Sequence, residues 1–102
     1  MNPDKLSVQV PHGLNNQLVT AYRDRCRKSL IDLRAALDRA DFEYLRIFGH
    51  RLKGTGGAYG FAGLAEIGAC IENRATARDT VAIAGQATAL EEYLDHVVVL
   101  SE

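Results

Sequence analysis

FGHRLKGTGGAYGFAGL, residues 48–64, places His50 and Lys53 among six glycines. The sequence on both sides has apolar residues spaced three and four apart, which is typical of amphipathic helices. A glycine inside a helix costs about 0.5–1 kcal/mol relative to alanine, so this concentration of glycine needs a reason other than helix formation. The histidine and the lysine beside the glycines indicate a functional surface.

Successive residues of a helix are rotated by about 100°, which separates this stretch into two faces. The apolar face lies within about 60° of Leu45 and holds Phe48, Gly49, Leu52, Gly56 and Tyr59. The other face lies about 80–180° from Leu45 and holds Arg46, His50, Lys53, Gly54 and Gly57. We therefore expect His50 to project away from the core. We expect Gly54 and Gly57 to leave a bare strip that a partner macromolecule can approach.

The flanking sequence predicts three more helices. Residues 14–40 form the first, with Asn15 as its cap and a buried stripe of Leu18, Tyr22, Cys26, Ser29, Leu33, Ala36 and Ala40. The histidine helix begins after the N-cap Asp41 and ends near Gly60, a residue suited to the left-handed turn that stops a helix. A third helix buries Leu64, Ile67, Gly68 and Ile71, and a polar turn at residues 73–79 precedes a fourth that buries Ile83, Ala87, Leu90, Leu94, Val97 and Val98. Short turns between amphipathic helices predict an all-α fold, an antiparallel four-helix bundle over residues 13–102.

The N-terminal segment differs from the rest of the chain. LSVQV, residues 6–10, alternates between apolar and polar residues as a strand does, and its only candidate partner is HVVVL at 96–100. An isolated pair of short strands would be marginally stable. We therefore predict that residues 1–12 form an extended or short helical arm.

Composition excludes several classes of protein. The chain has 102 residues and a net charge of −1, which fits one domain and argues against a general nucleic-acid binder. The apolar run VVVL at 97–100 is too short to cross a membrane. Two cysteines do not make a disulfide framework, so a cytoplasmic setting is the simplest expectation. We expect a monomer, because the predicted bundle is complete in one chain. The opening methionine and the short length favour a free-standing protein.

The residues His50, Leu52, Lys53 and Gly54, followed by TGGAYGFAGL, resemble the motif of histidine-containing phosphotransfer (HPt) domains. The resemblance continues into LAEIGACIE at 64–72 and includes the preceding DLRAALDRADFEYLRIFGHRLKG at 32–54. It therefore covers most of residues 14–75.

The resemblance implies a four-helix bundle whose exposed His50 accepts a phosphoryl group. The donor would be the aspartate of a receiver domain, or a sensor histidine kinase acting through one, and another response-regulator receiver would take the group. The resemblance also makes Lys53 the nearby cation and Gly54 the small residue beside the histidine. Arg46 and Gly57 on this face, and Ile47 next to it, are candidate contacts for the partner.

The sequence also indicates which chemistry the chain lacks. No histidine or carboxylate lies three or four residues after His50, so we expect no metal site there. No phosphate-binding G-x-x-x-x-G-K-[ST] motif is present, so the chain should be a phosphocarrier without kinase activity, and Mg²⁺ would belong to the partner receiver. The alternative is a helical-bundle adaptor that docks a signalling partner without phosphotransfer.

Overall fold

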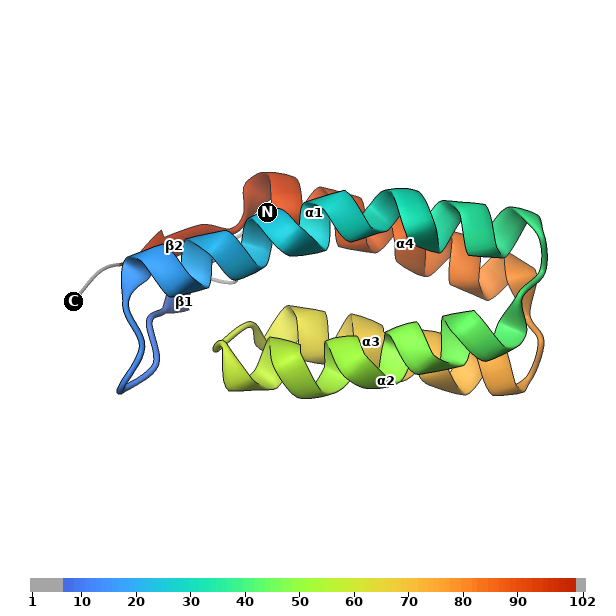
Figure 1. Cartoon of the computed structure of the whole chain (residues 1–102), viewed down its shortest axis with the longest axis horizontal. Helices are drawn as coiled ribbons and strands as arrows, with labels where there is room; N and C mark the ends of the chain where they lie inside the picture. Colours follow the sequence, from blue (N-terminus) through green and yellow to red (C-terminus); the bar gives the residue numbers. More distant parts are fainter. Residues whose placement is uncertain (1–6, 101–102) are drawn as a thin grey trace.

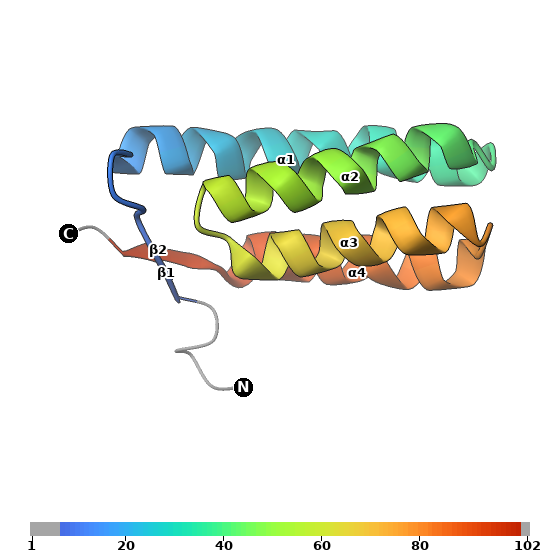
Figure 2. The ribbon, with the colours of Figure 1, turned by 90° about the horizontal axis from the view of Figure 1, so that it is seen from below.

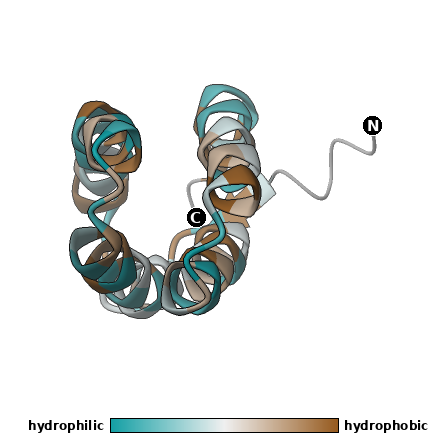
Figure 3. Cartoon of the chain, turned by 90° about the vertical axis from the view of Figure 1, so that its right-hand side faces the viewer, coloured by the Kyte–Doolittle hydropathy of each residue, from teal (hydrophilic) through white to brown (hydrophobic). Residues whose placement is uncertain are grey.

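The computed structural model describes residues 7–100, which fold into an antiparallel four-helix bundle (Figures 1 and 2). The elements in chain order are β1 Ser7–Gln9, α1 Asn16–Asp38, α2 Phe42–Ala58, α3 Ala62–Thr76, α4 Thr80–His96 and β2 Val98–Leu100. Figure 3 looks along the bundle from the end that holds the α1–α2 and α3–α4 connections. The predicted all-α bundle is confirmed. Within residues 7–100, no helix has the length and the apolar content needed to cross a membrane.

Three of the helices begin at a side-chain cap. The Asn15 side chain accepts a hydrogen bond from the Leu18 N–H at 2.9 Å, and the Asp41 side chain accepts one from the Tyr44 N–H at 3.0 Å. Asp79 caps α4 in the same way. Such caps satisfy N–H groups that have no partner within the helix. The predicted caps Asn15 and Asp41 are confirmed.

Two residues after the end of α1, α2 and α3 the chain has a residue with positive φ: Ala40 at 55°, Gly60 at 87° and Arg78 at 57°. The next N–H then bonds back across the last turn, as from Phe61 to the Gly56 carbonyl at 2.7 Å. Gly60 stops its helix as predicted. The prediction of Ala40 in the buried stripe of the first helix was wrong, because Ala40 is an exposed residue of the turn that follows α1. The predicted turn at 73–79 is shorter than expected, since α3 continues to Thr76.

The core lies along the inner faces of the four helices. On α1 the buried residues are Val19, Tyr22, Cys26, Leu30, Leu33 and Ala36. The prediction of Leu18 on this face was wrong, because the stripe begins one residue later and leaves Leu18 48% exposed. The inward residues of α3 and α4 are largely as predicted, with Leu64, Ile71, Ile83, Ala87, Leu90 and Leu94 buried.

Helices α2 and α3 touch through their backbones. A Cβ atom added to Gly49 would collide with the Glu72 N–H nitrogen and would lie 2.7 Å from the Gly68 carbonyl oxygen. A Cβ atom added to Gly68 would collide with the Lys53 nitrogen and would lie 2.7 Å from the Gly49 carbonyl oxygen. Gly56 makes a similar approach to Ala65 further along α2. The packed face predicted for Gly49 and Gly56 is confirmed, and its role is to bring α3 into backbone contact.

The two terminal segments pair, which corrects the predicted arm. Strands β1 and β2 are parallel, with Val8 opposite Val99, and they lie at the bundle end that holds the α2–α3 turn (Figure 1). The pair is not isolated, because Val8, Val10 and Val97 are buried in the bundle core. The fourth helix accordingly ends at His96, and Val98 is an exposed strand residue instead of the predicted helical core residue. Residues 1–6 of the arm lie outside the described residues.

We predict opposite effects for two glycines of α2. Gly49→Ala should lower the free energy of unfolding by about 1–3 kcal/mol, the usual cost of overpacking, because its Cβ meets backbone atoms of α3 that cannot move aside. Gly54→Ala should raise the free energy of unfolding by about 0.5–1 kcal/mol, since nothing lies within 4 Å of its Cβ position. Urea unfolding of both variants measures the difference. Equal stabilities would contradict the backbone contact between α2 and α3.

Candidate functional site

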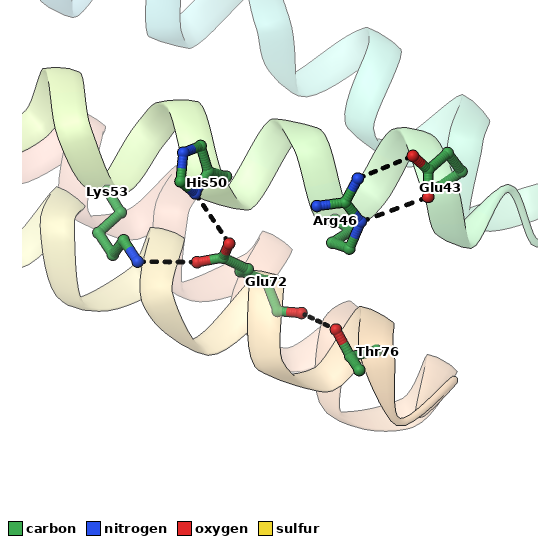
Figure 4. Close-up of polar contacts among 6 residues, drawn as sticks. All are labelled: Glu43, Arg46, His50, Lys53, Glu72 and Thr76. Atoms are coloured by element: carbon green, nitrogen blue, oxygen red, sulfur yellow. Dashed lines mark hydrogen bonds and ion pairs between the residues drawn. The ribbon is translucent and has the colours of Figure 1, made fainter.

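The outward face of α2 presents a short row of basic side chains. His50 lies in the middle of the helix with 65% of its side chain exposed, and Lys53 follows one turn later with 46% exposed. Arg46 lies one turn before His50 (Figure 4). His50 therefore projects into solvent, as its position opposite the apolar face predicts.

A carboxylate from the neighbouring helix joins this row. Glu72 of α3 has one carboxylate oxygen 2.9 Å from His50 Nδ1, and its other oxygen accepts a hydrogen bond from Lys53 Nζ at 2.9 Å. Figure 4 shows the carboxylate between the two side chains of α2. Lys53 first, and then His50, lower the pKa of Glu72 below its usual value. Glu72 is therefore ionised at neutral pH and can only accept hydrogen bonds.

The ionised carboxylate selects one form of the histidine ring. A neutral imidazole carries a proton on one nitrogen and a lone pair on the other. Because Glu72 accepts a hydrogen bond at Nδ1, the neutral ring keeps its proton there and has its lone pair on Nε2. The contact with Glu72 therefore leaves Nε2 as the nucleophilic nitrogen of an exposed side chain.

Sequence reasoning missed Glu72. Residue spacing within the histidine helix does not indicate Glu72, because it lies 22 residues after His50 on another helix. The available signal was the helical spacing of Gly68 and Glu72, which lie four residues apart and therefore on one face of α3. Pairing that face with the Gly49 face of α2 would have placed Glu72 beside His50.

The other predicted site residues have distinct surroundings. Arg46 forms an ion pair with Glu43 at 2.8 Å, so its guanidinium is engaged on its own helix. Gly54 and Gly57 have open space where a Cβ would stand, which agrees with the expected bare strip. Ile47 is half-buried and lines a cleft between α1 and α2. The structure thus brings His50, Lys53 and Glu72 together, whereas Ile47 lies on the side of α2 that faces α1.

An exposed nucleophilic nitrogen, a nearby ammonium group and a bare helical surface suit transfer of a phosphoryl group between proteins. Such transfer depends mainly on positioning and on stabilisation of negative charge.

Searches of curated proteins and of solved structures gave no significant match to the chain. The family model of the Hpt domain matches residues 17–99, which include all four helices apart from the first residue of α1. Domains of this kind are phosphocarrier modules of two-component signalling and have no kinase activity of their own. The match spans most of the chain and includes the helix that carries His50, so the chain belongs to the Hpt domain family.

Proposed function

We propose that this chain is a phosphorelay intermediate that carries a phosphoryl group on Nε2 of His50. It accepts the group from the aspartate of a receiver domain, or from a hybrid histidine kinase, and passes it to the aspartate of another response regulator. The observation that carries the proposal is the exposed His50 ring with its Nδ1 held by Glu72 at 2.9 Å. That contact leaves the Nε2 lone pair available to a partner.

The transfer step follows from this arrangement. The Nε2 lone pair attacks the phosphorus of the aspartyl phosphate, and the nitrogen–phosphorus bond forms as the phosphorus–oxygen bond breaks. The electron pair of the broken bond leaves with the aspartate as a carboxylate. The phosphorylated ring is a cation that keeps its Nδ1 proton, and the Glu72 carboxylate stabilises that proton by accepting its hydrogen bond. Transfer to the next receiver reverses these bond changes.

Lys53 and the glycines support the same step. Lys53 Nζ lies beside the site and can turn from Glu72 toward the phosphoryl oxygens as a mobile positive charge. Gly54 and Gly57 present no side chain, so a receiver can bring its aspartate close to the ring. Arg46 and Ile47 flank this approach and would contact the receiver. The Mg²⁺ that neutralises charge during transfer would be bound by the receiver.

The setting of the relay is part of the proposal. We expect the chain to act as a monomer in the cytoplasm, because transfer needs the His50 face free for successive receivers. Its partners are receiver domains and the sensor histidine kinase that feeds them. An adaptor that docks the same partners without chemistry is the competing outcome of the experiment below.

His50→Gln should abolish phosphorylation while leaving the fold intact, because the exposed ring has no role in the core. The test incubates the wild-type chain and the variant with a panel of phosphorylated receiver domains. An acid-labile, alkali-stable phosphate on the wild-type chain alone is the expected result. His96, an exposed histidine on α4, provides the matched control, and His96→Gln should load normally. Binding of a receiver without any transferred phosphate would favour the adaptor.

Glu72→Gln should slow loading of His50 by about fivefold, the size expected of an exposed ionic contact. The amide can still fill the space, but it has no charge to stabilise the phosphorylated ring or to fix the proton on Nδ1. Nitrogen-15 NMR of the unphosphorylated variant should show a larger share of the form protonated on Nε2. Glu66→Gln changes an exposed carboxylate of α3 that does not contact His50, and it should alter neither quantity. An unchanged ratio of the two ring forms would show that Glu72 does not fix the proton on His50 Nδ1.

A further inference from the structure

The end of α2 has a low intrinsic tendency to be helical. Residues 54–58, here called the glycine-rich segment, hold three glycines among five residues. Glycine disfavours a helix because it loses more backbone freedom on folding than any other residue. Gly56 is held against α3, but Gly54 and Gly57 face open space. The bare strip beside His50 therefore lies on a part of α2 that needs support from elsewhere in the fold.

One tyrosine of α1 contacts this part of α2 at two points, one helical turn apart. The Tyr22 hydroxyl lies 2.7 Å from the Thr55 hydroxyl. The Tyr22 ring stacks on the Tyr59 ring, with 4.3 Å between the centroids and 3° between the planes. Tyr22 is itself fixed in place, because only 5% of it is exposed and its ring also lies beside Phe61. The two contacts thus join the glycine-rich segment to the core of the bundle.

The neighbouring atoms set the direction of the hydrogen bond. The Thr55 hydroxyl donates its one proton to the Arg51 carbonyl at 2.9 Å, so toward Tyr22 it can only accept. Burial raises the pKa of Tyr22 above its ordinary value, so this hydroxyl keeps the proton that it donates. The bonds therefore run from Tyr22 through Thr55 to the backbone of Arg51, the residue that follows His50.

We propose that Tyr22 is a positioning residue for phosphotransfer. Through Thr55 and Tyr59 it holds the glycine-rich segment helical, so that the bare strip is already formed when a receiver arrives. The inference rests on the proposed function, in which the receiver approaches His50 over this strip. Tyr22 does not touch the reacting atoms and acts through the backbone of α2. Because a receiver binds the closed segment, its apparent Kd rises as the closed fraction falls.

Hydrogen exchange followed by mass spectrometry measures how often the segment opens. Tyr22→Phe keeps the stacked ring and removes the hydroxyl, whereas Thr55→Val removes the acceptor at an exposed position. Each should speed amide exchange in the glycine-rich segment about fivefold, the effect of one hydrogen bond. The two changes together should be no faster than either alone, because both remove the same bond. Thr55→Ser keeps the acceptor and should exchange as the wild type does.

Tyr93→Phe is the matched control. The Tyr93 hydroxyl is hydrogen-bonded to the backbone of Gly63, which lies at the same end of the bundle but on α3. Its removal costs a bond of the same kind without touching α2, so exchange in the glycine-rich segment should stay at the wild-type rate. An equal rise in this control would show that the segment responds to any loss of stability, and it would overturn the proposal. Wild-type exchange in Tyr22→Phe and Thr55→Val would also overturn it.

Receiver binding separates a positioning role from a merely structural one. Thr55→Val combined with Tyr59→Ala removes both contacts from the α2 side and leaves Tyr22 in place. A hydrogen bond and an aromatic stack are together expected to hold the segment closed by roughly 25-fold. In this double variant, Kd for the unphosphorylated receiver and KM for the phosphorylated one should rise about threefold, while kcat stays nearly constant. Unchanged affinity in a double variant whose segment exchanges much faster would overturn the positioning role.

A small phosphate donor distinguishes failure of this proposal from failure of the proposed function. Phosphoramidate reaches His50 without docking, so it should load the double variant and the wild type at the same rate. The absence of label on the wild-type chain would count against the phosphocarrier function, whereas hydrogen exchange would still measure the contacts of Tyr22. Slower loading of the double variant would place the defect at His50 itself and would overturn the role assigned to the strip.

Discussion

The backbone contact between α2 and α3 at Gly49 and Gly68 is the constraint on which the His50 site depends. Helices that pack through side chains have axes about 8–10 Å apart. Here a Cβ on either glycine would strike the backbone of the facing helix. This contact brings the backbone of Glu72 directly against α2, so a single carboxylate reaches both His50 and Lys53. The contact of Glu72 with His50 Nδ1 is therefore tied to the absence of side chains at Gly49 of α2 and Gly68 of α3.

The glycines of α2 serve two separate purposes. Gly49 and Gly56 face α3 and allow close packing, so their cost in helix stability is offset by contact with the neighbouring helix. Gly54 and Gly57 face open space and gain nothing from the fold. In the function proposed above, this cost is retained because a flat surface beside His50 lets a protein donor of phosphate come close. The glycines of one face of α2 thus allow contact with α3, and those of the other face leave the surface beside His50 bare.

The features predicted correctly from sequence are those set by local chemistry. Asn15 and Asp41 cap the starts of α1 and α2, and Gly60 stops α2, through contacts within a few residues. The two faces of α2 follow from the rotation between successive helical residues alone. Glu72 could not be placed, because its role depends on the distance between two helices. The β1–β2 pair was missed for a similar reason, since it is stable only after the bundle has brought the two ends of the chain together. The predictions for Leu18 and Ala40 were wrong because they lie at the two ends of the predicted buried stripe. A shift of one residue there changes which side chain is buried.

Glu72 contacts Nδ1 of His50, and in the proposed function this contact directs phosphate to Nε2. The most direct test is NMR of the phosphorylated chain labelled with nitrogen-15 histidine, which reports the nitrogen bonded to phosphorus through its coupling to phosphorus-31. We expect one phosphorylated residue, His50, with the coupling on Nε2 and the proton retained on Nδ1. A coupling on Nδ1 of His50, or phosphate on His12 or His96, would contradict it.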